Sequence, residues 1–198
     1  MSKRTDVMVD IETLGQGVDS TIFQIAAVAF DITSGEEYKT FNEVADISNR
    51  SLQVDGNTLK WWLKTDASLL NNLLNEQKGD KSPKEILGLF SEWLDGLAYN
   101  MKNVYLWGNG ILFDNKMIQY QMEKNGYKYP IFYRNDRDVR TILELASIKE
   151  GVSEWDLRKK HENPSLAVHD AINDVRFQIS LVAHCYTILT SNDELINL

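Results

Sequence analysis

The chain opens with three segments whose pattern of apolar and polar positions predicts β-strands. Residues 6–12 form an apolar run that ends in acidic positions, and residues 21–30 are nearly all apolar, as expected of a strand buried on both faces. A Ser34-Gly35 turn separates the second segment from residues 37–44, so these two segments are predicted to pair as a hairpin. Three successive strands therefore begin the protein.

Helical periodicity follows, because apolar residues recur at steps of three and four, in broken pieces, between positions 59 and 74. Ser82 is the predicted N-cap of the next helix, with Pro83 at its first position and Glu85 completing a capping box. A strand is expected next, over residues 103–107. Two helices are expected after it: one over residues 114–125, which ends before Gly126, and one over residues 138–146.

The last part of the chain combines a polar stretch with a long amphipathic helix. Residues 149–165 are polar and contain Gly151 and Pro164, which predicts a mobile loop. One buried stripe then defines the final helix, formed by Ile172, Val175, Ile179, Val182, Tyr186 and Leu189. Strands first, then helices mixed with strands, predict an α/β layered domain with a mixed sheet. No repeat or linker interrupts the pattern, so residues 1–198 are expected to form a single domain.

Composition narrows the class of protein only a little. Hydrophobic content of 43% and charged content of 25% are ordinary for a globular protein. No apolar signal segment and no membrane-length stretch is visible, so the expected location is cytoplasmic and no membrane partner is expected. Cys185 is the single cysteine and is expected to be a buried small hydrophobe.

The net charge of −8 argues against a protein that coats long duplexes, because such binding depends on clustered Lys and Arg. A nuclease is still compatible with this charge. Bound metal ions would supply positive charge locally, where the scissile phosphate lies.

Asp10 and Glu12 carry the first candidate chemistry. Side chains alternate along a strand, so these two carboxylates project from the same face, opposite Val7, Val9 and Ile11. Two ionised carboxylates in a dry core are costly, and a hard cation such as Mg²⁺ or Mn²⁺ offsets that cost. Asp-x-Glu alone is a short and common pattern, however, and two hydrated acids at the end of a strand explain it equally well.

Two further motifs add specificity: the run Trp-Gly-Asn-Gly-Ile-Leu-Phe-Asp over residues 107–114, and His-Asp-Ala-Ile-Asn-Asp over 169–174. Together with Asp-Ile-Glu-Thr at 10–13, they resemble, in order, the three exonuclease motifs of the DEDDh superfamily of 3′→5′ exonucleases. The resemblance extends from about residue 6 to 178 and is closest to small RNase T-like exonucleases, including stand-alone bacterial and phage members. Residues 135–141 also resemble a signature of an exoribonuclease subgroup.

The resemblance implies a ribonuclease H-like fold, a mixed sheet flanked by helices. It assigns Asp10, Glu12, Asp114 and Asp174 as metal-binding carboxylates and His169 as the general base. Two divalent ions, Mg²⁺ or Mn²⁺, about 4 Å apart would clamp the scissile phosphate, and a neutral imidazole would take the proton of the attacking water. Nucleoside 5′-monophosphates would then leave singly from the 3′ end of single-stranded RNA or DNA.

Substrate contacts are predicted around these motifs. The predicted substrate-binding residues are Thr13, Asn109, Phe113 and Arg137. Phe113 would stack on a base, as Trp61, Trp62 and Trp107 also could, although core packing explains most of the aromatic residues. Asn109 would hydrogen-bond the terminal nucleotide. Arg137 belongs to a set of basic residues that either contact phosphates or form a solvated surface, namely Arg137, Arg140, Arg158, Lys159 and Lys160.

Other side chains have simpler expected roles. Asp170 is expected to stabilise the amino-terminal end of the last helix through the helix dipole. His161 and His184 show no partner pattern, so a surface-loop and a satisfied core histidine are expected.

Alternative functions remain open at this point. One is a catalytically silent domain that binds nucleic acid or protein, since a fold does not fix function, although the presence of all five motif residues disfavours it. Another is an endonuclease of the wider ribonuclease H-like fold, which the position of His169 five residues before Asp174 disfavours. The subgroup resemblance favours RNA, with DNA as the alternative. A homodimer is also compatible, since dimers are frequent among related small exonucleases.

Overall fold

A computed structural model describes residues 4–48, 50–162 and 169–191. Its described strands form one mixed sheet in the order β3-β2-β1-β4-β5. β1 pairs antiparallel with β2 and parallel with β4, while β2 pairs antiparallel with β3 and β4 parallel with β5. The strands are β1 Thr5–Thr13, β2 Ile22–Phe30, β3 Glu37–Val44, β4 Val104–Gly108 and β5 Asp136–Asp138. The predicted opening strands, hairpin and mixed sheet are confirmed.

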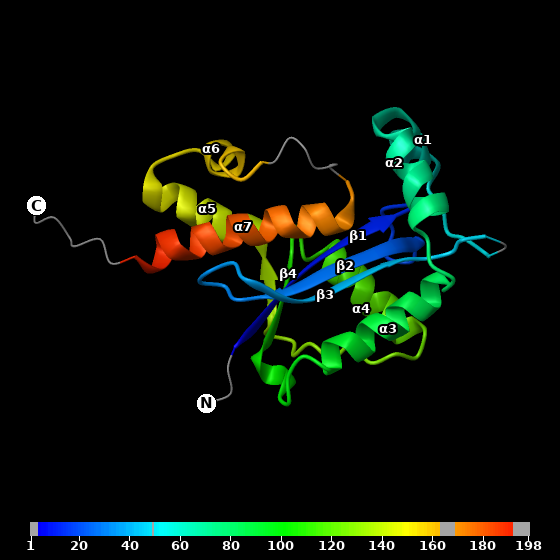
Figure 1. The fold of residues 1–198 in the computed structure, drawn as a ribbon, viewed down its shortest axis with the longest axis horizontal. Coiled ribbons are helices and arrows are strands. Elements are labelled where there is room, and N and C mark those ends of the chain that lie inside the picture. The colour runs from blue at the N-terminus through cyan, green and yellow to red at the C-terminus, as the bar shows by residue number, and fades with distance from the viewer. Residues whose placement is uncertain (1–3, 49, 163–168, 192–198) are drawn as a thin grey trace, which may run out of the picture.

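Helices cover both faces of this sheet (Figure 1). In chain order they are α1 Gly56–Thr65, α2 Ala67–Asn71, α3 Pro83–Asp95, α4 Asp114–Lys124, α5 Val139–Glu150, α6 Glu154–Lys159 and α7 Ala171–Thr190. A π-helical turn, Asn72–Gln77, follows α2, and a 3₁₀ turn, Met101–Asn103, precedes β4. α3 and α4 pack on one face and α5 and α7 on the other, whereas α1 and α2 lie beyond the carboxyl end of β1 (Figure 1).

The alternation of side chains along β1 decides which layer each residue enters. Val7, Val9 and Ile11 pack with α3 and α4 in one core cluster. Met8 packs with α5 and α7 in the other cluster. Asp10 and Glu12 follow Met8 at intervals of two residues, so their side chains project from the same face of β1, toward the layer that contains α7.

The predicted helix signals account for several boundaries. Ser82 and Glu85 form the predicted capping box, with Pro83 in the first turn of α3. The carboxylate of Asp138 accepts hydrogen bonds from the amides of Arg140 and Thr141, so α5 begins after this residue rather than at it. Cys185 is buried, as expected.

The prediction of one mobile loop over residues 149–165 is wrong for part of that stretch, because α6 forms within it. Gly151 adopts a left-handed conformation, with φ of 65°, and ends α5. Ser153 then caps α6 by accepting a hydrogen bond from the amide of Asp156, and Leu157 is fully buried. Residues 163–165 lie outside the described residues. None of the described helices is long and apolar enough to span a membrane.

Parallel strands place their carboxyl ends at one edge of the sheet, and β1, β4 and β5 share this direction. α4 follows β4 at that edge, and α5 follows β5 directly. Residues at the end of β1 and at the start of α4 and α5 are therefore brought together, which is the arrangement that forms ligand sites in open α/β sheets.

Candidate active site at the carboxyl end of β1

Carboxylates from three separate parts of the chain meet at this edge. Oxygens of Asp10, Glu12 and Asp174 lie within 4.8 Å of one another. The first two come from β1 and the third from the first turn of α7. Asp114, the first residue of α4, is 4% exposed, and its charge acts on both β1 acids. These four residues are called the acid cluster below.

A glycine makes room for Asp114. A Cβ placed on Gly108 would overlap the side-chain oxygen of Asn115 and lie 3.4 Å from the carboxylate of Asp114. Only glycine leaves space for this close approach between the end of β4 and the start of α4. The glycine that follows Trp107 in the sequence motif therefore has a packing reason as well as a place in a turn.

Burial governs the electrostatics of the acid cluster. It raises the pKa of Asp10 and Glu12 well above the usual values, and the neighbouring carboxylates raise them further. Burial also raises the pKa of Asp114 to about 7, although the backbone amides of Asp114 and Ile11 and the charge of Arg140 act in the opposite direction. Burial is also the largest cause of the raised pKa of Asp174.

The donor set fits a hard divalent cation. Every cluster side chain offers oxygen, and among the described residues no Lys, Arg or His side chain forms an ion pair with any of them. Within residues 4–48, 50–162 and 169–191, the side-chain donor to the cluster is Gln178, whose Nε2 donates a hydrogen bond to Oδ1 of Asp10 at 3.0 Å. Crowded, buried carboxylates without a cationic partner call for a bound positive charge.

His169 precedes Asp174 by five residues and lies beside it in space. Its backbone amide donates to Oδ2 of Asp174 at 3.2 Å, and its φ of 66° is the one positive value among the described non-glycine residues. The imidazole packs edge-on against Trp61 of α1, with ring centroids 4.9 Å apart. Trp61 was predicted only as a possible stacking residue, so its contact with the histidine was missed.

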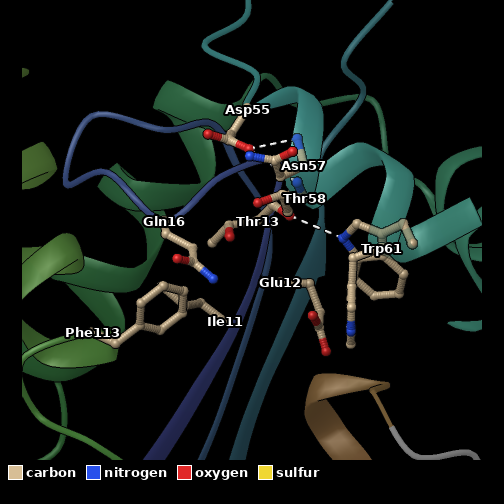
Figure 2. Close-up of a pocket in the computed structure, with 10 residues that line it drawn as sticks. Ile11, Glu12, Thr13, Gln16, Asp55, Asn57, Thr58, Trp61 and Phe113 are labelled. Carbon is tan, nitrogen blue, oxygen red and sulfur yellow. Dashed lines mark hydrogen bonds between the residues drawn. The ribbon is translucent and has the colours of Figure 1, made fainter.

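A pocket of 530 Å³ opens beside the cluster and contains two of the predicted substrate residues. Thr13 and Phe113 line it, together with Glu12, and Phe113 and Trp61 lie on opposite sides of Glu12 (Figure 2). Gln16 and the start of α1 complete the polar part of its lining. An aromatic and an amide group beside a carboxylate suit a nucleotide, which has a π-face and polar edges.

Asn109 and Arg137, the other two predicted contacts, lie differently. Asn109 is half-buried just after β4, and its Oδ1 has no hydrogen-bond partner within the described chain. The guanidinium of Arg137 stacks on Tyr105 at 4.7 Å and donates to main-chain oxygens. Tyr105 pairs with Asp6, four residues and roughly 13 Å before Asp10 along β1. The structure therefore does not bring Arg137 to the acid cluster.

Several polar contacts were not predicted from the sequence. Asp170 occupies the N-cap position of α7, at the helix end that its charge was expected to stabilise, and its carboxylate accepts a hydrogen bond from Nε2 of Gln24 at 3.0 Å. His161 and His184, for which no partner was predicted, share a hydrogen bond between Nε2 and Nδ1 at 2.8 Å. Gln178 was overlooked because the sequence signal of a glutamine on a helix face is weak.

The sheet order and the helical layers are shared with solved exonucleases of ribonuclease H-like fold, one of them a DEDDh family member, and the acid cluster with the family match indicates a 3′→5′ exonuclease. Enzymes of this class typically use divalent metals. The family model described as the 3′-5′ exoribonuclease Rv2179c-like domain matches residues 5–186. The chain therefore belongs to the Rv2179c-like 3′-5′ exoribonuclease domain family.

Known relatives are distant in sequence but similar in fold. An exodeoxyribonuclease of Enterobacteria phage T4 is 20% identical over 211 residues, covering 90% of this chain and 88% of the phage protein. The nuclease domain of 3′hExo, a DEDDh family member solved with rAMP, has a TM-score of 0.63 at 13% identity, covering 93% of this chain and 92% of that domain.

Two larger proteins contain a similar fold. Exonuclease I from Methylocaldum szegediense has a TM-score of 0.68 at 19% identity, covering 93% of this chain. Cell-death related nuclease 4 has a TM-score of 0.65 at 17% identity, covering 94% of this chain. The chain spans only 40% and 64% of those two proteins, respectively.

Proposed function

We propose that the protein removes nucleoside 5′-monophosphates one at a time from the 3′ end of single-stranded nucleic acid. The observation that supports this most strongly is the meeting of Asp10, Glu12 and Asp174 within 4.8 Å, with buried Asp114 beside them. RNA is the favoured substrate, given the description of the family, and DNA is the alternative, given the phage relative.

In this proposal the acid cluster holds two divalent ions, Mg²⁺ or Mn²⁺. When bound, the ions activate water and stabilise the departing 3′ oxygen, chemistry typical of paired divalent ions on phosphate esters. Gln178 orients the carboxylate of Asp10 through its hydrogen bond. A terminal nucleotide enters the pocket beside Glu12, where Phe113 supplies a face for the base and Thr13 lies close to the sugar.

His169 is the proposed general base. Its main-chain contact with Asp174 keeps the residue at the cluster, and Trp61 limits how far the imidazole can turn. A neutral imidazole accepts the proton of the attacking water in the same step in which the phosphodiester bond breaks. The charge of His169 in turn acts on Asp174 and lowers the pKa of that carboxyl, against the effect of burial.

The test is an incubation of 5′-labelled single-stranded RNA and DNA oligomers with Mg²⁺ or Mn²⁺, beside an Asp10→Ala variant. We expect a ladder of shortened labelled products that the variant and EDTA both abolish. The ratio of RNA to DNA rates gives the sugar preference. Wild-type protein that leaves both oligomers intact would reject the exonuclease and favour a silent binding domain, whereas internal cuts without a ladder would favour an endonuclease.

A further inference from the structure

Two arginines lie near the acid cluster without an ion pair of their own. Within the described chain, neither Arg140 nor Arg158 forms a salt bridge with a carboxylate. The protein carries a net charge of −8, so an approaching polyanion meets general repulsion. Positive charge close to the site therefore has a large influence on how a nucleic-acid strand approaches it.

Arg140 reaches the cluster from the side of α4. It lies in the first turn of α5, at the edge where β4 and β5 end. A Cβ built on Gly110 would lie 3.3 Å from the guanidinium carbon, so the side chain lies against the turn that leads to Asp114. The charge of Arg140 acts on Asp114 and lowers a pKa that burial raises.

Arg158 reaches the cluster from the side of α7. It is half-buried in the last turn of α6, and its guanidinium carbon lies 5.2 Å from the ring centroid of Phe177. Phe177 follows Asp174 by about one turn of α7. The charge of Arg158 acts on Asp174 and lowers its pKa, against the effect of burial.

Two of the remaining basic candidates lie elsewhere. Arg137 is stacked on Tyr105, remote from Asp10 along β1. The ammonium group of Lys159 sits over Trp155, 4.7 Å from the ring centroid, on the exposed side of α6. Arg140 and Arg158 are thus the two candidates whose guanidinium groups lie against a segment that leads to or carries a cluster acid: the turn before Asp114 and α7.

We propose that Arg140 and Arg158 each bind a backbone phosphate of the single strand whose 3′ end lies at the acid cluster. This inference rests on the proposed function. The planar guanidinium fork matches two phosphate oxygens, and the contact carries no information on base identity. The substrate class is therefore any single-stranded polynucleotide with phosphates on the 5′ side of the scissile bond.

The test measures binding separately from cleavage. Fluorescence anisotropy with a labelled single-stranded oligomer in EDTA, across a series of NaCl concentrations, gives the affinity and its salt dependence. We expect Arg140→Gln and Arg158→Gln each to weaken binding about tenfold. Each should also reduce the slope of log K against log salt by about 0.7, the contribution of one phosphate in a single strand.

Arg134→Gln is the matched control. It removes the same charge from an exposed arginine that stacks on Tyr133, so affinity and slope should stay at the wild-type values. Arg140→Lys keeps the charge and should retain the salt slope while losing part of the affinity, because the fork is lost. A merely structural role of Arg140 would change the melting temperature and leave the slope unaltered.

The outcomes separate the two proposals. Wild-type protein that binds with the expected slope but cuts no oligomer would reject the exonuclease and retain the phosphate site. Wild-type protein that cuts oligomers, with both glutamine variants equal to it in affinity and slope, would overturn the phosphate site alone. Wild-type binding without any salt dependence would overturn it as well.

Discussion

The two ends of β1 bury carboxylates in opposite electrostatic surroundings. At the amino end, Asp6 is 1% exposed, and its oxygens accept hydrogen bonds from Arg4 at 2.7 and 2.8 Å and from Trp107 Nε1 at 2.8 Å. At the carboxyl end, Asp10 and Glu12 face other carboxylates and, within the described chain, no cationic side chain bonds to them.

The difference separates a carboxylate that stabilises the fold from the carboxylates that we propose take part in catalysis. Asp6 is neutralised by a cation from its own strand segment, and Tyr105 stacks on that cation at 4.3 Å, so its burial is locally compensated. The acid cluster forms no ion pair in the described chain, and the hydrogen bond from Gln178 and the charges of Arg140 and Arg158 compensate it only in part. Burial therefore still raises the pKa of its members. Electrostatic repulsion between buried carboxylates is expected at a site that binds a ligand of opposite charge.

The largest expected effect tests this difference through pH and metal. Burial raises the pKa of Asp114 to about 7, whereas an unfolded aspartate titrates near 3.9. Between about pH 4 and 7 the unfolded chain has released this proton and the folded chain retains it, so stability falls as pH rises. Asp114 alone would account for about 4 kcal/mol. Melting temperatures in EDTA should fall across this range, and Mg²⁺ should restore them most at the upper end.

His161 acts in the opposite direction within that range, because burial lowers its pKa and the stability lost through this group at acid pH returns as pH rises toward about 6.5. Asp46 does not interfere there. Hydrogen bonds to Ser48 lower the pKa of Asp46 to about 2, so the stability it provides is lost only below the range. A metal-free melting temperature that stayed constant from about pH 4 to 7, with no response to Mg²⁺, would show that the cluster is not strained.

The next expected effect concerns His169, the proposed general base. His169→Ala should lower kcat by about 10² or more, the usual contribution of a positioned general base. The hydrogen bond of this residue to Asp174 comes from its backbone amide, so the fold and the position of Asp174 should survive the change, while the ring contact with Trp61 is lost. His161→Ala is the matched control, because that imidazole bonds to His184 and is not among the cluster contacts. Full activity in His169→Ala would reject its role.

The sequence predicted those parts of the fold that depend on local pattern. Alternation in β1, the capping box at Ser82 and the apolar stripe of α7 each have a short-range physical cause, and all are confirmed. α6 was missed because a six-residue helix in a polar stretch offers little periodicity. The meeting of distant acids was predicted from ordered motifs, and their roles stay predictions.

Contacts between distant polar side chains could not be predicted. Gln178 bonds to Asp10 across 168 positions, and Gln24 bonds to Asp170 across 146 positions. Neither spacing has a periodic signature in sequence, because both contacts depend on how α7 crosses the sheet. Arg137 rather than Arg140 was predicted as a substrate contact for a related reason. The motif that contains both arginines gives no information on which side of β5 each guanidinium lies.

The smallest expected effect compares the two ends of β1 directly, through the same substitution at Asp6 and at Asp10. Asp6→Asn leaves Arg4 and Trp107 with a neutral partner, and the side chain of Arg4 is 39% exposed, which limits the loss to about 2 kcal/mol. Asp10→Asn removes one of several repelling, buried charges, so in EDTA it should raise the melting temperature above that of wild type. The same substitution at two positions of one strand, four residues apart, should therefore change stability in opposite directions. Thermal unfolding in EDTA near neutral pH measures both, and two shifts of the same sign would mean that the acid cluster is compensated by the fold after all.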